Sequence, residues 1–214
     1  LNQKEPIIYV SQELSIFNKN KKSIAINHGI WWDGDFNFLK KVIIKITQRT
    51  ALKRMSKIIC VDTNYINWCH TELANRPSWR SKLVYIPNYA DLDLFSFKEH
   101  KGNSPNPTII YPRRLMGNNI ETNERGIGLF LEVIGLLEKD EIKPFYKFIG
   151  RGSLQSVVEH SLNKIGIDKS RYEIKDVDFK NIAEEYHNSD IAVIPTLAHE
   201  GTSLSAIEAM VCGI

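Results

Sequence analysis

The strongest constraint on the fold is a repeated alternation of short apolar runs with longer stretches of helical periodicity. In the first half of the chain the apolar runs at 23–27, 57–62 and 82–86 predict buried strands, and the stretches at about 36–55 and 64–75 predict helices. This alternation is typical of βαβ units on a parallel sheet. We therefore expect an α/β protein.

The alternation is interrupted between Pro87 and Pro107. This stretch holds three prolines and the polar run 101–104, and it is too long for an ordinary loop between a strand and a helix. We expect a first domain over 1–95, a linker over 96–107 and a second domain over 108–214. The elements predicted after the linker are strand 108–111, helix 124–139, strand 145–149, helix 153–164, strand 172–174, helix 181–187, strand 190–195 and helix 203–211.

The composition excludes several classes of protein. With 43% hydrophobic and 25% charged residues, the 214-residue chain can form hydrophobic cores and is not intrinsically disordered. Cys60, Cys69 and Cys212 leave an odd thiol and lack metal-ligand spacing, which fits a reducing compartment. No apolar run approaches the roughly 20 residues that a spanning helix needs. A net charge of +3 gives no indication of nucleic-acid binding.

The two ends suggest a piece of a longer protein. The chain begins at Leu1 and reaches a strand-like run at 7–10 almost at once. At the other end, Gly213 follows the last predicted helix in the manner of a helix-ending glycine. We expect the chain to be truncated at both ends, with the first domain incomplete.

Two glutamates eight positions apart flank the start of the last predicted helix. Glu200 lies in the preceding loop, and the free backbone N–H groups of 201–203 would attract a phosphate or another anion. Glu208 lies beside the apolar stripe of the helix, so its carboxylate needs hydrogen-bond donors such as vicinal hydroxyls. A capping box of Ser205 and Glu208 is the alternative. The position beyond the carboxyl end of a strand, where open α/β sheets bind ligands, favours the ligand.

The segment from Glu200 to Ile214 resembles the E-x7-E signature of the retaining GT-B glycosyltransferases of family four, also called glycosyltransferase group 1. The resemblance implies two Rossmann-like domains with parallel sheets facing a cleft. It also implies transfer of a sugar from a nucleotide-diphosphate sugar to an acceptor hydroxyl, with retention of configuration and without a metal or other cofactor. Carried over, Glu208 holds the donor ribose and Glu200 lies near the transferred sugar. The implied backbone contacts to the donor come from Gly201, Thr202, Ser203 and Leu204.

Two basic segments resemble the clamp that the family places on the donor diphosphate. Arg113 and Arg114 follow a predicted strand, and Arg125 stands at the start of the next predicted helix after a spacer longer than is usual in the family. An arginine fork can neutralise the leaving diphosphate without a metal. Surface ion pairs with Glu121 or Glu124 are the alternative for Arg113 and Arg114.

Glycines and a histidine complete the candidate site. Gly150 and Gly152 lie in a strand–turn–helix that borders the donor nucleotide in the resembled family, and a tight turn with positive φ would explain them equally well. Gln155 replaces the third glycine of a dinucleotide fingerprint, which argues against nicotinamide binding. His28 resembles the family's strand-end histidine, and we count it with Glu200 as a catalytic candidate. A structural histidine is the alternative.

The stretch 36–57 contains seven basic residues and no acidic residue, interleaved with apolar side chains. Such a helix could lie on anionic lipid. A domain helix with its apolar side on the sheet and its charges in water is the commoner arrangement. We expect a cytoplasmic protein, on the inner face of the membrane if the lipid account holds.

The expected partners are a nucleotide sugar and a glycan or lipid-linked acceptor, as in cell-surface polysaccharide or glycolipid biosynthesis. Two other functions remain open at this point. One is a different GT-B enzyme, such as a sugar-nucleotide epimerase or a phosphorylase. The other is a non-catalytic protein that only binds the nucleotide sugar.

Overall fold

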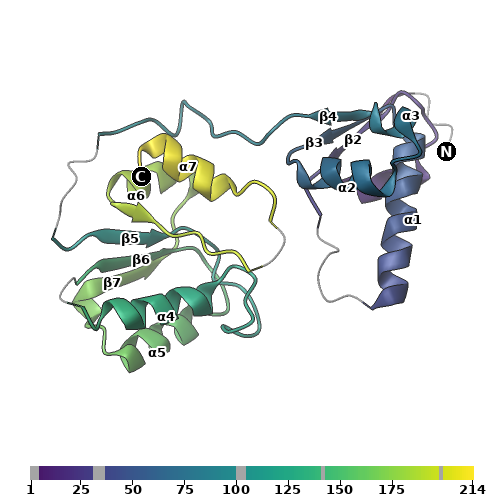
Figure 1. The fold of residues 1–214 in the computed structure, drawn as a ribbon. Coiled ribbons are helices and arrows are strands. Elements are labelled where there is room, and N and C mark those ends of the chain that lie inside the picture. Colours follow the sequence, from purple (N-terminus) through teal and green to yellow (C-terminus); the bar gives the residue numbers. More distant parts are fainter. Residues whose placement is uncertain (1–4, 31–36, 100–104, 141–142, 198–199) are drawn as a thin grey trace. The chain divides into compact units, whose positions relative to one another are not determined.

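Both halves of the chain fold around a parallel β-sheet, as the alternation of strands and helices predicts (Figure 1). In this computed structural model the described residues are 5–30, 37–99, 105–140, 143–197 and 200–214. The chain divides into two units by its internal contacts. The first unit comprises Leu1–Asn88 with His199–Thr202, and the second comprises Tyr89–Ala198 with Ser203–Ile214.

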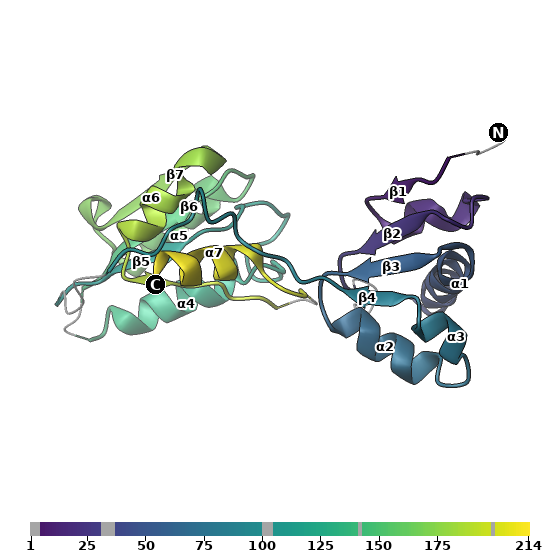
Figure 2. The same ribbon diagram turned by 90° about the horizontal axis from the view of Figure 1, so that it is seen from above.

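The sheet of the first unit has the strand order β1-β2-β3-β4, and every neighbouring pair is parallel (Figure 2). Its strands are β1 (Ile8–Tyr9), β2 (Ile24–Asn27), β3 (Lys57–Cys60) and β4 (Leu83–Tyr85). Its helices are the 3-10 helix η1 (Gln12–Phe17), α1 (Phe38–Arg54), α2 (Asn64–Glu72) and α3 (Pro77–Arg80). The sequence did not predict η1 and α3, because elements of six and four residues are too short to show a helical period.

Helix α1 carries most of the basic stretch, and only part of its apolar surface lies on the sheet. Ala51 and Leu52 are fully buried. Four apolar residues of its first half expose more than half of their surface, which departs from the commoner arrangement of a domain helix. These residues are Phe38, Leu39, Ile43 and Ile46. Residue 36 lies outside the described residues, and among the described helices none is long and apolar enough to cross a bilayer.

The sheet of the second unit is also parallel, with the strand order β7-β6-β5-β8. Its strands are β5 (Thr108–Tyr111), β6 (Phe145–Ile149), β7 (Tyr172–Lys175) and β8 (Ile191–Ala192). Its helices are α4 (Ile127–Leu137), α5 (Gln155–Ile165), α6 (Ile182–His187) and α7 (Leu204–Cys212), with 3-10 turns η2 (Lys169–Arg171) and η3 (Phe179–Asn181). The chain runs outward from β5 to β7 and then returns to pair β8 with the other edge of β5. Open α/β sheets bind ligands at such a switch point.

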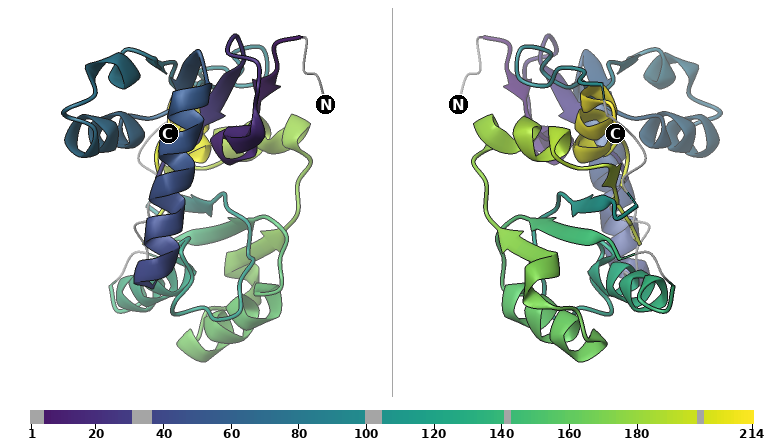
Figure 3. Two further views of the ribbon diagram at one scale, coloured as in Figure 1. Left: turned by 90° about the vertical axis from the view of Figure 1, so that its right-hand side faces the viewer. Right: turned by 90° about the vertical axis from the view of Figure 1, so that its left-hand side faces the viewer.

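Helices cover both faces of this second sheet, with α4 and α5 on one face and α6 and α7 on the other (Figure 1 and Figure 3). Neighbouring residues of β5 face opposite sides, as the two-residue period of a strand requires. Tyr111 joins the core under α4 and α5, where it stacks on Phe130 at 5.6 Å between ring centroids. Ile110 joins the core under α6 and α7 with Tyr186. Each layer therefore has its own apolar core.

The second unit begins before the linker predicted at 96–107. Phe95 is 1% exposed and lies 6.2 Å from the Tyr186 ring and 5.8 Å from the Phe179 ring, measured between centroids. Downstream, the backbone N–H of Lys98 donates to the Cys212 carbonyl at 3.4 Å. Phe95, which was predicted at the end of the first domain, thus belongs to the second unit, and so does Lys98, which was predicted in the linker.

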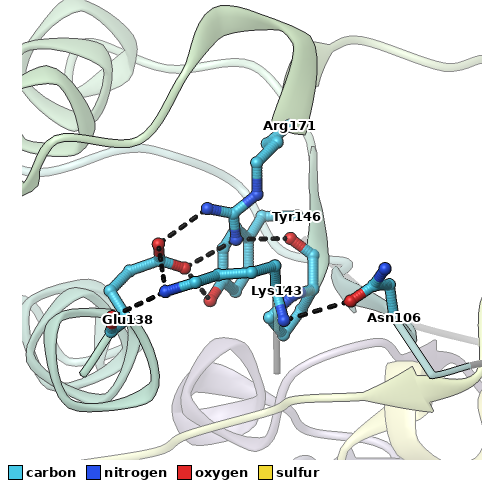
Figure 4. Close-up of polar contacts among 6 residues, drawn as sticks. Asn106, Glu138, Lys143, Tyr146 and Arg171 are labelled. Atoms are coloured by element: carbon cyan, nitrogen blue, oxygen red, sulfur yellow. Dashed lines mark hydrogen bonds and ion pairs between the residues drawn. The ribbon is translucent and has the colours of Figure 1, made fainter. Parts of the chain in front are cut away.

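An ion-pair cluster closes the amino end of this sheet (Figure 4). The Arg171 guanidinium donates two hydrogen bonds of 2.6 Å to the two carboxylate oxygens of Glu138, one to each. Lys143 lies 3.6 Å from the same carboxylate, and the Tyr146 hydroxyl donates to it at 3.3 Å. Arg171 holds the pKa of Glu138 below its ordinary value. The cluster fastens the end of α4 to β6 and to the segment before β7.

Candidate functional site

Arg113 is a buried cation just beyond the carboxyl end of β5. Its residue surface is 6% exposed, and Nη1 donates to the Thr196 hydroxyl at 2.7 Å. Thr196 follows β8, so this contact bridges the switch point of the sheet. The surface ion-pair account does not fit Arg113 because the side chain is buried. Arg114 is exposed, and within the described ranges it forms no ion pair. A guanidinium held at this edge is suited to an anionic ligand.

The backbone around Arg125 connects three segments at the same edge. The Tyr111 hydroxyl donates to the Arg125 carbonyl at 3.0 Å, and the Arg125 N–H donates to Asn123 Oδ1 at 3.0 Å. Gly126 has φ of +68°, and a Cβ there would lie 2.7 Å from Pro195. Helix α4 therefore starts at Ile127 rather than at the predicted residue 124. Arg125 keeps its place beside the strand ends.

The turn with Gly150 and Gly152 packs directly on the backbone that follows β5. A Cβ at Gly150, whose φ is +148°, would lie 2.7 Å from the Arg113 carbonyl oxygen, and a Cβ at Gly152 would collide with the Leu115 carbonyl. The Leu115 N–H donates to the Arg151 carbonyl at 3.0 Å. Backbone packing is sufficient to explain both glycines, and their contact with a donor nucleotide stays a prediction.

Glu208 is a buried acid in the second turn of α7. It is 9% exposed, and its Oε2 accepts a hydrogen bond of 3.0 Å from the Tyr186 hydroxyl. The helix begins at Leu204, and the Ser205 hydroxyl donates to the Pro112 carbonyl at 3.2 Å. The capping box of Ser205 and Glu208 is therefore wrong, because both side chains bond elsewhere.

The surroundings of Glu208 disfavour its charge. Burial raises the pKa of the Glu208 carboxyl, while the hydrogen bond from Tyr186 lowers it by a smaller amount. In the part of the chain that the structure describes, no lysine or arginine forms an ion pair with Glu208. A carboxylate in this situation gains from further hydroxyl or N–H donors supplied by a ligand.

The remaining residues of the signature lie before α7. Ser203 is the N-cap of α7, and its side chain makes no capping hydrogen bond. Thr202 accepts a hydrogen bond of 3.4 Å from Asn88 Nδ2 through its backbone carbonyl. Gly201 packs against Asp62 in the first unit, and Glu200 is half-buried. These residues are divided between the two units: Gly201 and Thr202 group with the first unit, and Ser203 groups with the second.

His28 follows β2 in the first unit with an exposed ring. Its Nε2 lies 2.8 Å from the Val10 carbonyl oxygen. A carbonyl only accepts, so this nitrogen carries the proton and Nδ1 presents its lone pair when the ring is neutral. Beside it, Asn27 donates to Gln12 Oε1 at 3.0 Å and accepts from the Gly29 N–H at 2.9 Å. A backbone carbonyl thus orients the His28 ring, and the neighbouring Asn27 belongs to a buried polar network.

Several residues that hold the predicted site residues in place were not identified from the sequence. Thr196 and Tyr186 hold the predicted Arg113 and Glu208, and Gln12 supports the His28 turn. The long spacer before Arg125 lines a polar cavity of about 270 Å³. Only Thr196 had a sequence signal, because it follows a predicted strand. In the described ranges no group of three His, Cys, Asp or Glu side chains could hold a metal ion.

Comparison with protein families gives a match over the second half of the chain. The profile described as Glycosyl transferases group 1 matches residues 107–214. No curated protein sequence matches the chain.

Several solved structures have a similar fold. A variant of TarM from S. aureus, solved with UDP, α-GlcNAc-glycerol and fondaparinux, has a TM-score of 0.60 at 19% identity, covering 93% of this chain and 38% of TarM. The pneumococcal O-GlcNAc transferase GtfA, solved with UDP and GlcNAc, has a TM-score of 0.64 at 13% identity over 88% of this chain and 35% of GtfA. WaaG, a glycosyltransferase involved in lipopolysaccharide biosynthesis, has a TM-score of 0.58 at 12% identity over 95% of this chain and 60% of WaaG. The chain spans less than two thirds of each. The similarity confirms the predicted α/β fold of the GT-B type.

Proposed function

The chain belongs to the glycosyl transferases group 1 family, and we propose that it takes part in moving a sugar from a nucleotide-diphosphate sugar to an acceptor hydroxyl with retention of configuration. The observation that carries this proposal is Glu208. This buried acid has a raised pKa and one hydroxyl donor, and it lies in the same unit as the buried cation Arg113 at a switch point. A ribose supplies the hydroxyl donors that Glu208 needs, and a diphosphate supplies the anion that Arg113 suits.

In the proposed reaction the protein positions the donor and neutralises its leaving group. Glu208 accepts hydrogen bonds from the two ribose hydroxyls, and Arg113, with Arg114 and Arg125, stabilises the diphosphate as its bond to the sugar breaks. Backbone groups of 203–204 contact the donor. The acceptor hydroxyl forms the new bond, and its proton passes to the departing diphosphate. No side chain acts as nucleophile, and no metal is required.

The remaining assignments concern the sugar itself. Glu200 and His28 are proposed to contact the transferred sugar, with Nδ1 of His28 as the available acceptor atom when the ring is neutral. Because TarM and GtfA were solved with UDP, UDP-sugars are the first donors to test. A glycan or a lipid-linked acceptor is proposed for the other substrate, with cell-surface polysaccharide or glycolipid biosynthesis as the setting.

The test of the donor site is the Glu208→Gln substitution in the full-length protein. We expect UDP to bind more weakly by about 1.5 to 3 kcal/mol, the scale of a hydrogen bond to a charged group. Glu132→Gln, on the exposed side of α4, is the matched control and should leave the affinity unchanged. Isothermal titration calorimetry measures both. An unchanged affinity in the Glu208→Gln variant would remove the ribose assignment.

The reaction type is tested separately from binding. The full-length protein is incubated with a donor sugar in the presence and in the absence of an acceptor, and products are followed by mass spectrometry and NMR. Transfer that requires the acceptor and keeps the anomeric configuration supports the proposal. Conversion of the donor alone indicates an epimerase, and binding without any conversion indicates a non-catalytic protein.

Contact with the membrane is proposed through α1. The exposed apolar residues Leu39, Ile43 and Ile46 share this helix with basic residues, and no acidic residue occurs in 36–57. We expect co-sedimentation with vesicles that contain phosphatidylglycerol and not with pure phosphatidylcholine. A variant with Ile43→Asn and Ile46→Asn should lose this binding. Equal binding to both vesicles would contradict the proposal and leave α1 as an ordinary domain helix.

A further inference from the structure

Asp62, just beyond the carboxyl end of β3, is a buried acid with only one oxygen hydrogen-bonded. The residue is 4% exposed. Its Oδ1 accepts from the backbone N–H of Asn64 at 2.8 Å and of Tyr65 at 3.4 Å, which caps the start of α2. Its Oδ2 is buried and has no hydrogen-bond partner within the described part of the chain. A buried acceptor in this state is costly, so its presence needs a cause.

Two glycines leave room for this carboxylate. Gly29 has φ of +109°, and a Cβ there would lie 2.5 Å from Asp62 Oδ2. A Cβ at Gly201 would collide with the same oxygen. Gly201 belongs to the segment His199–Thr202, which groups with the first unit. The carboxylate of Asp62 therefore fills the space that a side chain at either glycine would need.

A second contact fixes the same segment. Asn88 Nδ2 donates to the Thr202 carbonyl at 3.4 Å, one residue beyond Gly201. The backbone of 200–202 thus meets Asp62 on one side and Asn88 on another. Both contacts come from residues that follow the carboxyl ends of the first sheet, at β3 and after β4.

We propose that Asp62 is a positioning residue that fixes the segment 200–202 and with it the carboxylate of Glu200. The role of Glu200 rests on the proposed function, whereas the fixing of the backbone does not. Asp62 acts through space filling: its Oδ2 excludes any side chain at 201, and the glycine backbone then lies against the carboxylate. This steric requirement explains why residue 201 is a glycine, independently of any bound donor.

The test uses substitutions that separate the size of Asp62 from its capping role. Serine also caps helices well but lacks the second oxygen, so Asp62→Ser keeps the start of α2 and opens space beside Gly201. Asp62→Asn keeps both the cap and the volume. Gly201→Ala introduces the colliding Cβ. We expect Gly201→Ala to be relieved by Asp62→Ser in the double variant and not by Asp62→Asn.

The first measurement needs no substrate. Hydrogen–deuterium exchange of the peptide 200–204 in the free full-length protein should rise roughly tenfold in Gly201→Ala, a factor typical of coupled neighbours. The double variant with Asp62→Ser should exchange no faster than the faster single variant. Asp168→Ser, the same substitution at the matched cap on Ser170, should leave this peptide unchanged. Purely additive effects, or unchanged exchange in both Asp62→Ser and Gly201→Ala, would overturn the proposal.

The second measurement is made once transfer activity has been found. Asp62→Ser should lower kcat several-fold and leave KM for the donor nearly unchanged, because it loosens Glu200 without touching the ribose or diphosphate contacts. A raised KM with unchanged kcat would overturn the positioning role. If the wild-type protein transfers no sugar, the proposed function fails, and the exchange experiment still decides whether Asp62 fixes the segment.

Discussion

The carboxyl edges of the two sheets are built from different material. In the second unit the glycine turn at this edge packs backbone against backbone, beside the side-chain contact of Arg113 with Thr196: the Leu115 N–H donates to the Arg151 carbonyl at 3.0 Å, and the Leu154 N–H donates to the Leu115 carbonyl at 2.8 Å. In the first unit it is a network of buried polar side chains, with Asn27 bonded to Gln12 and Asp62 capping α2. Main-chain geometry thus fixes the glycine turn of the second unit, whereas the edge of the first unit is held by side chains that can change conformation.

This difference shows which edge can adjust to a ligand. In the described first unit, Gln48 Oε1 and Asp62 Oδ2 are buried without a hydrogen-bond partner. Among the described residues of the second unit, the one such atom is Arg171 Nε, which belongs to the cluster at the amino end of the sheet and not to the carboxyl edge. A backbone interlock is formed before any ligand binds. Unpaired side-chain atoms gain when a ligand or a moving segment supplies their donors.

The largest expected effect comes from adding a methyl group to each edge. Gly152→Ala should destabilise the second unit by about 3 kcal/mol or more, because the new Cβ meets the Leu115 backbone, which cannot move aside. Gly29→Ala should cost the first unit about 1 to 2 kcal/mol for its positive φ, because the new Cβ meets the end of one side chain, Asp62 Oδ2, rather than backbone.

Urea unfolding distinguishes the two units. All four tryptophans lie in the first unit, so tryptophan fluorescence follows that unit and amide circular dichroism follows both. Gly152→Ala should lower the urea concentration at which the second unit unfolds. This change should appear in the circular dichroism and not in the tryptophan fluorescence. Equal losses from both substitutions would show that the edges do not differ in rigidity.

The next effect tests whether the contrast is confined to the carboxyl edges. At the amino end of the second sheet, Glu138→Gln removes a bidentate pair with Arg171, and we expect a loss of about 2 to 3 kcal/mol near neutral pH. Arg171 holds the pKa of Glu138 below its ordinary value, so this stabilisation is present above the ordinary pKa of about 4.3. It is lost as the pH falls through the lowered pKa of the folded state.

Unfolding free energies measured from neutral to acidic pH check this sign. The wild-type protein and the Glu138→Gln variant should differ near neutral pH and converge in acid. A difference that stays constant with pH would show that packing rather than charge holds this end of the sheet.

The sequence predicted the elements well where burial alone decides them. Strands β5 and β6 lie at the predicted residues, because a short apolar run bounded by turn residues has one way to be buried in a parallel sheet. Strand β8 is shorter than predicted: Ile191 and Ala192 pair with β5, and the Val193 N–H still donates to the Ile110 carbonyl at 2.8 Å before the chain turns away. Local pattern does not encode where pairing stops.

The residues of the candidate site were proposed from motifs, and the motifs do not contain their contacts. Arg113 and Glu208 were identified from the sequence, but their partners Thr196 and Tyr186 lie 83 and 22 residues away and come from tertiary packing. The same holds for Asp62, whose sequence context shows only a strand followed by a helix. Long-range pairing of polar groups depends on the geometry of the whole sheet, which residue periodicity does not contain.

The smallest expected effect concerns Glu208, the buried acid of the second unit. Tyr186→Phe removes the hydroxyl that donates to Glu208 and that lowers its pKa, so the pKa of Glu208 should rise further above its ordinary value. A protonated carboxyl accepts ribose hydroxyls less well, so nucleotide affinity should fall as the pH falls through this pKa. In the variant, that fall should begin at a higher pH and cost about 1 kcal/mol at mildly acidic pH.

Calorimetric titrations of UDP over a range of pH locate this fall for the wild-type protein and the variant. Glu208→Gln serves as the control, because it cannot titrate and its affinity should not change over the same range. A shift of the affinity profile to higher pH in Tyr186→Phe would show that the charge of Glu208 depends on the Tyr186 side chain, even though backbone contacts fix this edge of the sheet. Superimposable profiles would mean that the bound nucleotide alone keeps Glu208 ionised and that the Tyr186 hydroxyl does not affect its charge. The contrast between the two edges would then extend to their electrostatics.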